Sequence, residues 1–223
     1  MDKVVTIAKQ YNLEIIEDCA QAHGAKYKNH SVGTFGVGCF SFYPTKNLGA
    51  LGDGGAITCN NKHYSQKINL LRNYGSEKKY YYEKLGYNSR LDEIQAGFLS
   101  VKLSILDEII EHKRGLARLY LDNLSDRFIK PIVDDDTYDV YHIFNIRHKY
   151  RDELKKHLID KGIKTEVHYP IPPHQQKSMN NIIDGEYPIS EVIHNTTLSL
   201  PISYFHTKED VLTVCEIMNN WNG

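Results

Sequence analysis

The feature that most constrains this chain is the stretch from Cys39 to Thr58, which places one lysine between two strand-like segments and a run of glycines. Residues 39–42 form an apolar run long enough for a buried strand, and a Tyr-Pro turn signal follows it. Lys46 comes next, then four glycines within residues 49–55, then a second strand-like run at 55–58. Glycines this dense let a backbone take left-handed turns and approach a ligand closely.

Lys46 is therefore a candidate nucleophile. A lysine held between two strands has few rotamers and little water, and desolvation favours the neutral amine that a nucleophile needs. Lysines beside glycine-rich loops are more often solvated, so this pattern alone favours a functional role only weakly. A phosphate-binding GxxxxGK[ST] loop is excluded, because Thr45 precedes the lysine and Asn47 follows it.

A second group of residues, upstream in the sequence, supports a functional role for Lys46. Residues 13–17 read as a strand, and Asp18 follows where its carboxyl end should be. Ligands of open α/β sheets bind outside those carboxyl ends. Ser41 lies near the end of the next strand. An acid, a hydroxyl and a lysine on neighbouring strand ends are the groups that a pyridoxal phosphate site needs.

Three motifs carry a resemblance to a known family. They are EDCAQAHGA at 17–25, SFYPTKNLGALGDGGAI at 41–57 and GYNSRLDEIQA at 86–96. Together they strongly resemble the sugar aminotransferases of the DegT/DnrJ/EryC1/StrS family, which are pyridoxal phosphate enzymes of fold type I. The resemblance implies an α/β chain. Residues 1–125 would be part of the large fold-type-I domain, ending in a long helix, and residues 126–223 a small α+β C-terminal domain.

The resemblance also implies roles for individual residues. Lys46 would form the Schiff base with pyridoxal 5'-phosphate, and Asp18 would keep the pyridine nitrogen protonated. Gln21 would hydrogen-bond the ring substituents, and Ser41 would bind the phosphate. Asn88 would reach across a homodimer to the phosphate of the neighbour's cofactor.

The reaction implied by the family is transfer of an amino group, with glutamate as donor, to a keto-sugar nucleotide. Lys46, once freed, would move the proton between substrate and cofactor as base and acid. Some relatives carry histidine at this position and dehydrate the sugar, so the lysine favours transamination. The lysine region and NYGSEKKYYY resemble members acting on dTDP-linked 3-keto-6-deoxy sugars, in surface polysaccharide (lipopolysaccharide) or glycoside biosynthesis.

Three further residues are candidates for contact with substrate. Residues 72–84 are polar and rich in tyrosine, and the family suggests a lid or arm near the sugar nucleotide, with Tyr74 and Tyr81 as contacts. A solvated loop is an equally good interpretation. His168 could face substrate, although a structural histidine at a strand end is the more common case.

The remaining pattern predicts secondary structure along the chain. Residues 26–31 are expected to form a surface turn, and residues 89–92 a capping box that opens a long amphipathic helix from 91 to about 124. A βαββα-like order is expected in the second domain. Further helices are predicted at 2–11, 62–71, 151–159 and 210–221, and further strands at 141–146, 165–168 and 198–200.

Composition restricts the class of protein. With 27 basic and 28 acidic residues the net charge is −1, and no basic stripe suggests nucleic acid. A mean hydropathy of −0.48 and the lack of a long apolar run predict no membrane span. The four cysteines show no CxxC spacing, which is typical of reduced thiols in the cytoplasm. The eleven histidines form no HExxH pair, so no metal site is predicted.

The alternative hypothesis is a truncated, non-catalytic remnant of such an enzyme. Family members have a substantial segment ahead of the first motif, and a phosphate cup needs backbone N–H groups from a turn at a helix start. No such turn precedes Asp18 in this sequence. On this interpretation we expect the chain alone to bind cofactor weakly or not at all.

Overall fold

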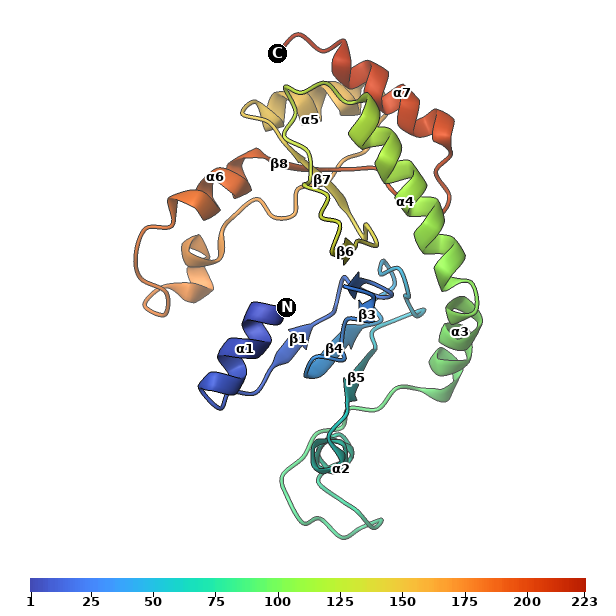
Figure 1. Ribbon diagram of the computed structural model, residues 1–223, viewed down its shortest axis with the longest axis vertical. Helices are drawn as coiled ribbons and strands as arrows, with labels where there is room; N and C mark the ends of the chain where they lie inside the picture. Colours follow the sequence, from blue (N-terminus) through green and yellow to red (C-terminus); the bar gives the residue numbers. More distant parts are fainter. The chain divides into compact units, whose positions relative to one another are not determined.

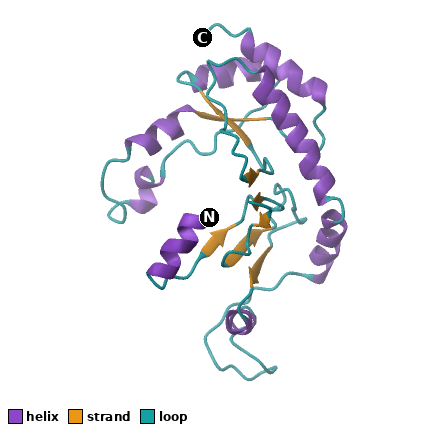
Figure 2. Ribbon diagram, in the orientation of Figure 1, coloured by secondary structure: helices purple, strands orange, loops and turns teal.

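The computed structural model describes residues 1–223, which form two compact units. Unit 1 comprises residues 1–110 and 134–142, and unit 2 comprises residues 111–133 and 143–223. Figure 1 labels their elements, and Figure 2 shows that both units combine helices with strands. The predicted mixed α/β class is confirmed. The domain boundary expected at residues 125–126 stays a prediction.

Unit 1 is built on a three-stranded sheet of order β1-β4-β5. β1 pairs with β4 in parallel, whereas β4 pairs with β5 antiparallel. The predicted strand at 13–17 is shorter and begins later, since only three residues pair. The elements are α1 (Asp2–Gln10), β1 (Ile16–Asp18), β4 (Val37–Ser41), β5 (Gly55–Cys59) and α2 (Lys62–Leu71).

The surface turn predicted at 26–31 is in fact a small hairpin. β2 (Lys26–Tyr27) and β3 (His30–Ser31) pair antiparallel, and β6 (Thr137–Tyr138) adds a third strand. The two residues between β2 and β3 have φ values of 47° and 64°. Positive φ at both central positions is typical of the tight turns that match strand twist.

The single long helix predicted from residue 91 to 124 is wrong. Two helices occupy this range, α3 (Glu93–Leu103) and α4 (Leu106–Asn123). At the break the Ser104 hydroxyl donates to the carbonyl oxygen of Val101 at 2.7 Å, and the Ile105 N–H bonds the carbonyl of Lys102. A serine that bonds a preceding carbonyl competes with the helical ladder, and a bond spanning three residues tightens the last turn.

The capping box predicted at residues 89–92 is also wrong. α3 begins only at Glu93, and its N-cap residue Asp92 makes no side-chain capping bond. The Ser89 N–H instead donates to the carbonyl of Arg72 at 2.9 Å. This contact, distant in the sequence, holds residue 89 in a loop.

Unit 2 is centred on an antiparallel pair of strands, β7 (Phe144–Arg147) and β8 (Thr197–Leu200). α5 contacts both β8 and α7. The predicted strand at 165–168 is wrong, because only Glu166 forms an isolated bridge, to Ser199. The helices are α5 (Arg151–Asp160), α6 (Pro188–Thr196) and α7 (Lys208–Asn219), with two short 3-10 turns, η1 (Pro173–Gln175) and η2 (Lys177–Met179).

Each unit has its own apolar core. In unit 1 a cluster joins the segment after β4 to α3 and α4, and it consists of Leu48, Ala50, Leu99, Leu106, Ile110 and Val140. In unit 2 the side chains with no exposed surface include Phe144, Ile146, Leu154, Leu158, Leu198 and Met218. None of the helices is both long enough and apolar enough to cross a bilayer.

Candidate active site

The carboxyl edge of the parallel strand pair brings two predicted site residues together. Asp18 is the last residue of β1 and Ser41 the last residue of β4, and Asp18 pairs in register with Cys39. The Asp18 side chain is exposed, and its Oδ1 accepts the Ala20 N–H at 3.1 Å. Parallel strands end at one edge of a sheet, so a carboxylate and a hydroxyl lie at neighbouring strand ends.

Lys46 lies in the loop that leaves this same edge, residues 43–54, which we call the lysine loop. Its backbone N–H donates to the Tyr43 carbonyl at 2.9 Å, closing a turn, and its side chain is half-buried. Gly49 passes so close to the chain that a Cβ there would lie 2.4 Å from the Pro44 carbonyl oxygen. Only glycine fits such an approach, so the glycine-rich sequence has a packing reason.

Three side chains that the sequence did not single out hold the lysine loop. The Asn47 amide donates to the Val140 carbonyl at 3.0 Å, and Gln95 accepts the Leu51 N–H at 2.9 Å. The Lys102 ammonium donates to the Gly49 carbonyl at 2.6 Å. Asn47 belongs to the second motif and Gln95 to the third, whereas Lys102 lies outside all three motifs.

Glu17 stabilises the turn before β4. Its Oε2 accepts the Gly33 N–H at 2.8 Å, and its Oε1 accepts those of Phe35 and Gly36 at 2.8 and 2.9 Å. Three backbone donors converge on one carboxylate. The two neighbouring acids therefore differ in role. Glu17 accepts backbone hydrogen bonds that hold a turn, whereas the Asp18 side chain is exposed to solvent.

His23 is the most buried polar side chain of the first motif. It is 3% exposed, and its ring lies 5.5 Å from that of Phe40. Burial lowers the pKa of His23 below the ordinary 6.5, and the Lys46 ammonium lowers it further. The Ser41 backbone has the smaller, opposite effect and raises the pKa of His23. Neither ring nitrogen of His23 has a hydrogen-bond partner of normal geometry. His23 is thus a neutral core residue beside the site.

The remaining unit 1 candidates lie on other segments. Gln21 is exposed in the turn after β1. Asn88 is exposed and forms a backbone bridge with Asn73, and Tyr74 lies beneath the Arg90 guanidinium at 5.2 Å. Tyr81 is 62% exposed. None of the hydrogen bonds of the structure joins Asn88, Tyr74 or Tyr81 to the lysine loop.

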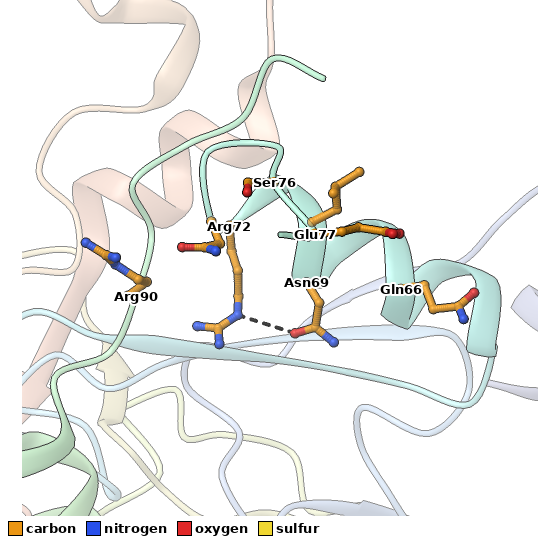
Figure 3. Close-up of a pocket in the computed structure, with 8 residues that line it drawn as sticks. Gln66, Asn69, Arg72, Ser76, Glu77 and Arg90 are labelled. Carbon is orange, nitrogen blue, oxygen red and sulfur yellow. Dashed lines mark hydrogen bonds between the residues drawn. The ribbon is translucent and has the colours of Figure 1, made fainter. Parts of the chain in front are cut away.

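A pocket of about 500 Å³ lies between α2 and residues 73–90, which we call the arm. Figure 3 shows Arg72 and Asn69 projecting from the end of α2, with the hydrogen bond of 3.3 Å between them drawn, and Arg90 on the returning segment. Its polar lining comprises Gln66, Asn69, Arg72, Asn73, Ser76, Glu77 and Arg90. This pocket was not predicted.

His168 belongs to unit 2, where it is half-buried. Its Nδ1 lies 2.7 Å from the Ser199 hydroxyl oxygen. It follows the bridge residue Glu166 by two positions, so it stands beside β8 without belonging to a strand.

An acid, a hydroxyl and a lysine loop at one strand edge are the kinds of groups that a pyridoxal phosphate site uses. The model of the DegT/DnrJ/EryC1/StrS aminotransferase family matches residues 1–219, and the chain belongs to this family.

Curated relatives extend the comparison. The chain is 49% identical over 223 residues to the dTDP-3-amino-3,6-dideoxy-alpha-D-galactopyranose transaminase of Aneurinibacillus thermoaerophilus, covering 99% of this chain and 61% of the relative. It is 39% identical over 226 residues to the dTDP-3-amino-3,4,6-trideoxy-alpha-D-glucose transaminase of Streptomyces venezuelae, covering 99% and 60%. The chain therefore spans about three fifths of the relatives it matches.

Solved structures agree with the fold. DesV of S. venezuelae, solved in complex with a ketimine intermediate, superposes with a TM-score of 0.96 at 39% identity, over 99% of this chain and 61% of the other. A family aminotransferase from Brucella abortus gives 0.93 at 34% identity, over 97% and 59%. The prediction of a fold-type-I sugar aminotransferase family is confirmed.

Proposed function

We propose that this chain is the part of a sugar-nucleotide aminotransferase that carries the lysine nucleophile. The observation that carries the proposal is the shared edge of β1 and β4, where Asp18 and Ser41 end neighbouring strands and the lysine loop begins. Identity of 49% to a dTDP-sugar transaminase over the whole chain supports the same reaction class.

The donor set fits pyridoxal 5'-phosphate. Asp18 offers an exposed carboxylate for a ring nitrogen, Ser41 a half-buried hydroxyl for the phosphate, and Lys46 an amine on a braced loop. Gln21, in the turn after Asp18, is our candidate for the ring substituents. When bound, the cofactor supplies an electron sink for amino transfer.

The residues of the chain then have distinct tasks. Lys46 binds the cofactor covalently, and after release its amine moves a proton as base and acid. Asp18 keeps the ring nitrogen protonated by its negative charge. Lys102 and Gln95 fix the lysine loop, so the amine is delivered to one place.

For the substrates we propose glutamate as amino donor and a dTDP-linked 3-keto-6-deoxyhexose as acceptor. The transaminases of A. thermoaerophilus and S. venezuelae, whose names specify dTDP-3-amino sugars, support this choice. Tyr74, Tyr81 and His168 are proposed contacts of the sugar nucleotide. The product would serve glycoside or surface polysaccharide synthesis, including lipopolysaccharide.

We further propose a homodimer in the cytoplasm. Asn88 is exposed, as a residue that serves the neighbouring subunit's cofactor must be. The four free cysteines form no disulfide, which is typical of proteins kept in a reducing compartment.

Borohydride trapping tests the proposal directly. The chain is incubated with pyridoxal 5'-phosphate, reduced and digested, and the labelled peptide is identified by mass spectrometry. We expect the label on Lys46, and its absence from a Lys46→Arg variant. Label on another lysine, with Lys46 unmodified, would overturn the assignment. A chain that takes up no cofactor would favour a non-catalytic remnant.

Asp18 is tested separately. Asp18→Asn keeps the shape of the side chain but removes the charge partner of the ring nitrogen, so turnover should fall by orders of magnitude while the fold persists. Near-normal turnover with an unchanged circular dichroism spectrum would remove Asp18 from the site.

A further inference from the structure

The strand register of unit 2 places three polar side chains in a row. Asn145 of β7 pairs directly with Ser199 of β8, and Ser199 pairs on its other side with Glu166. His168 follows Glu166 by two residues. Phe144 and Ile146, the neighbours of Asn145, are fully buried in the core, so Asn145 faces the other side.

These side chains form a chain of hydrogen bonds with a fixed direction. The Ser199 hydroxyl donates to Oδ1 of Asn145, and its oxygen lies 2.7 Å from Nδ1 of His168. A hydroxyl has one proton, and an amide oxygen can only accept. Since that proton is given to Asn145, Nδ1 of His168 must carry the proton that joins it to Ser199.

Because Ser199 is buried, the loss of one of these hydrogen bonds should be costly. Ser199 is 5% exposed, so water does not replace a lost partner easily. The ring of His168 stands at 88° to that of Tyr169, with 5.3 Å between centroids. The other ring nitrogen, Nε2, makes no hydrogen bond within the chain, and it is the atom left to meet a ligand.

We propose that Asn145 and Ser199 are positioning residues that hold His168 as its Nδ1–H tautomer, so that Nε2 accepts a hydrogen bond from a hydroxyl group of the sugar. The tautomer follows from the contacts of unit 2, whereas the identity of the ligand rests on the proposed function. The opposite tautomer would present an N–H donor and would select an acceptor instead.

Imidazole nitrogen NMR of the full chain, labelled with 15N-histidine and recorded at alkaline pH, reads the tautomer directly. We expect the Nδ1–H form in the unmodified chain, assigned by its loss in His168→Gln. Ser199→Ala should abolish the preference. Asn145→Asp should keep it, because a carboxylate still accepts from Ser199. His174 is an internal reference of opposite tautomer, since its Nε2 lies 3.0 Å from the Glu191 carboxylate.

An Nε2–H form of His168 in the unmodified chain, or no change in Ser199→Ala, would overturn the proposal. Addition of dTDP-glucose as a probe tests the ligand. A shift of the His168 Nε2 resonance that is lost in Ser199→Ala supports the hydroxyl contact. An unshifted Nε2 resonance with the expected tautomer contradicts the hydroxyl contact alone. Failure of the borohydride label would contradict the aminotransferase assignment without touching the tautomer.

Discussion

The lysine loop and the arm are both connections of unit 1 that carry proposed site residues, yet they are held very differently. In the lysine loop, residues 47–50 are buried, and its anchors come from positions 44 to 93 residues away. In the arm, Tyr80, Tyr81 and Tyr82 are 74%, 62% and 64% exposed. The backbone hydrogen bonds of the arm join it only to itself and to the end of α2, and the widest runs from Ser89 to Arg72. The unit therefore fixes the loop that carries Lys46, whereas the exposed part of the arm keeps freedom to adapt to a ligand or partner.

The largest effect is expected from removing the lysine itself. If Lys46 has its proposed role, Lys46→Ala should lower turnover by at least about 10²–10⁴-fold, because that variant would lack both the covalent link and the proton carrier. Steady-state turnover of glutamate with a dTDP-keto-sugar measures this. Lys79→Ala, in the exposed arm, is the matched control and should remain within a few fold. Equal losses in both variants would erase the distinction between the two regions.

A methyl group at Gly49 tests the packing of the lysine loop. The added Cβ would meet the Pro44 carbonyl oxygen at 2.4 Å, so the loop must shift, and Gly49→Ala should destabilise by about 1–3 kcal/mol. Gly97→Ala on α3 is the control, since nothing lies within 4 Å of its Cβ, and it should stabilise by about 0.5–1 kcal/mol. Equal shifts of the urea unfolding midpoint in the two variants would contradict the close approach of Gly49 to the Pro44 carbonyl.

Removing one anchor should loosen the lysine loop less severely. Gln95→Ala deprives the Leu51 N–H of its acceptor, at a cost of about 0.5–1.5 kcal/mol in the free energy of unfolding. Hydrogen exchange at Leu51 should accelerate relative to β4. Gln66→Ala, at an exposed position of α2, should change neither quantity. Unchanged exchange in Gln95→Ala would show that the other anchors suffice.

The pH dependence of stability tests the buried face behind the site. Burial and Lys46 depress the pKa of His23 in the folded chain, so the unfolded chain binds the proton more readily. The stability contributed by neutral His23 is fully present above about pH 6.5 and is lost as pH falls toward the depressed pKa. Urea unfolding between pH 5 and 8 should give a flatter pH profile of stability for His23→Leu than for the unmodified chain. A His23→Leu profile parallel to that of the unmodified chain would refute the shift.

The smallest effect on stability is expected in the arm. Tyr81 is largely exposed, and its ring contacts the Lys78 ammonium at 4.9 Å, so Tyr81→Ala should change the free energy of unfolding by less than about 0.5 kcal/mol. If the arm binds the sugar nucleotide, KM should rise with little change in kcat. A large loss of stability would mean that the arm is as firmly held as the lysine loop.

Local patterns predicted much of this protein. The predicted bounds of the helix at residues 62–71 are confirmed, strands form on both sides of Lys46, and three motifs identified the family. These succeed because apolar periodicity and glycine or proline turns act over a few residues. The roles of Asp18, Ser41, Lys46 and Asn88 stay predictions. Asp18 and Ser41 do lie at the carboxyl ends of neighbouring strands, and Lys46 lies in the loop that follows.

Only the tertiary structure decided the remainder, because the deciding contacts join residues far apart in the sequence. The local sequence predicts a capping box at Ser89, but the Ser89 N–H bonds the Arg72 carbonyl and residue 89 lies in a loop. The apolar repeat continues past Ser104, yet the helix breaks there. Gln95 and Lys102 became anchors of the lysine loop through contacts that no spacing reveals. The proximity of Asn145, Ser199 and His168 likewise depends on strand register, which the local sequence alone does not specify.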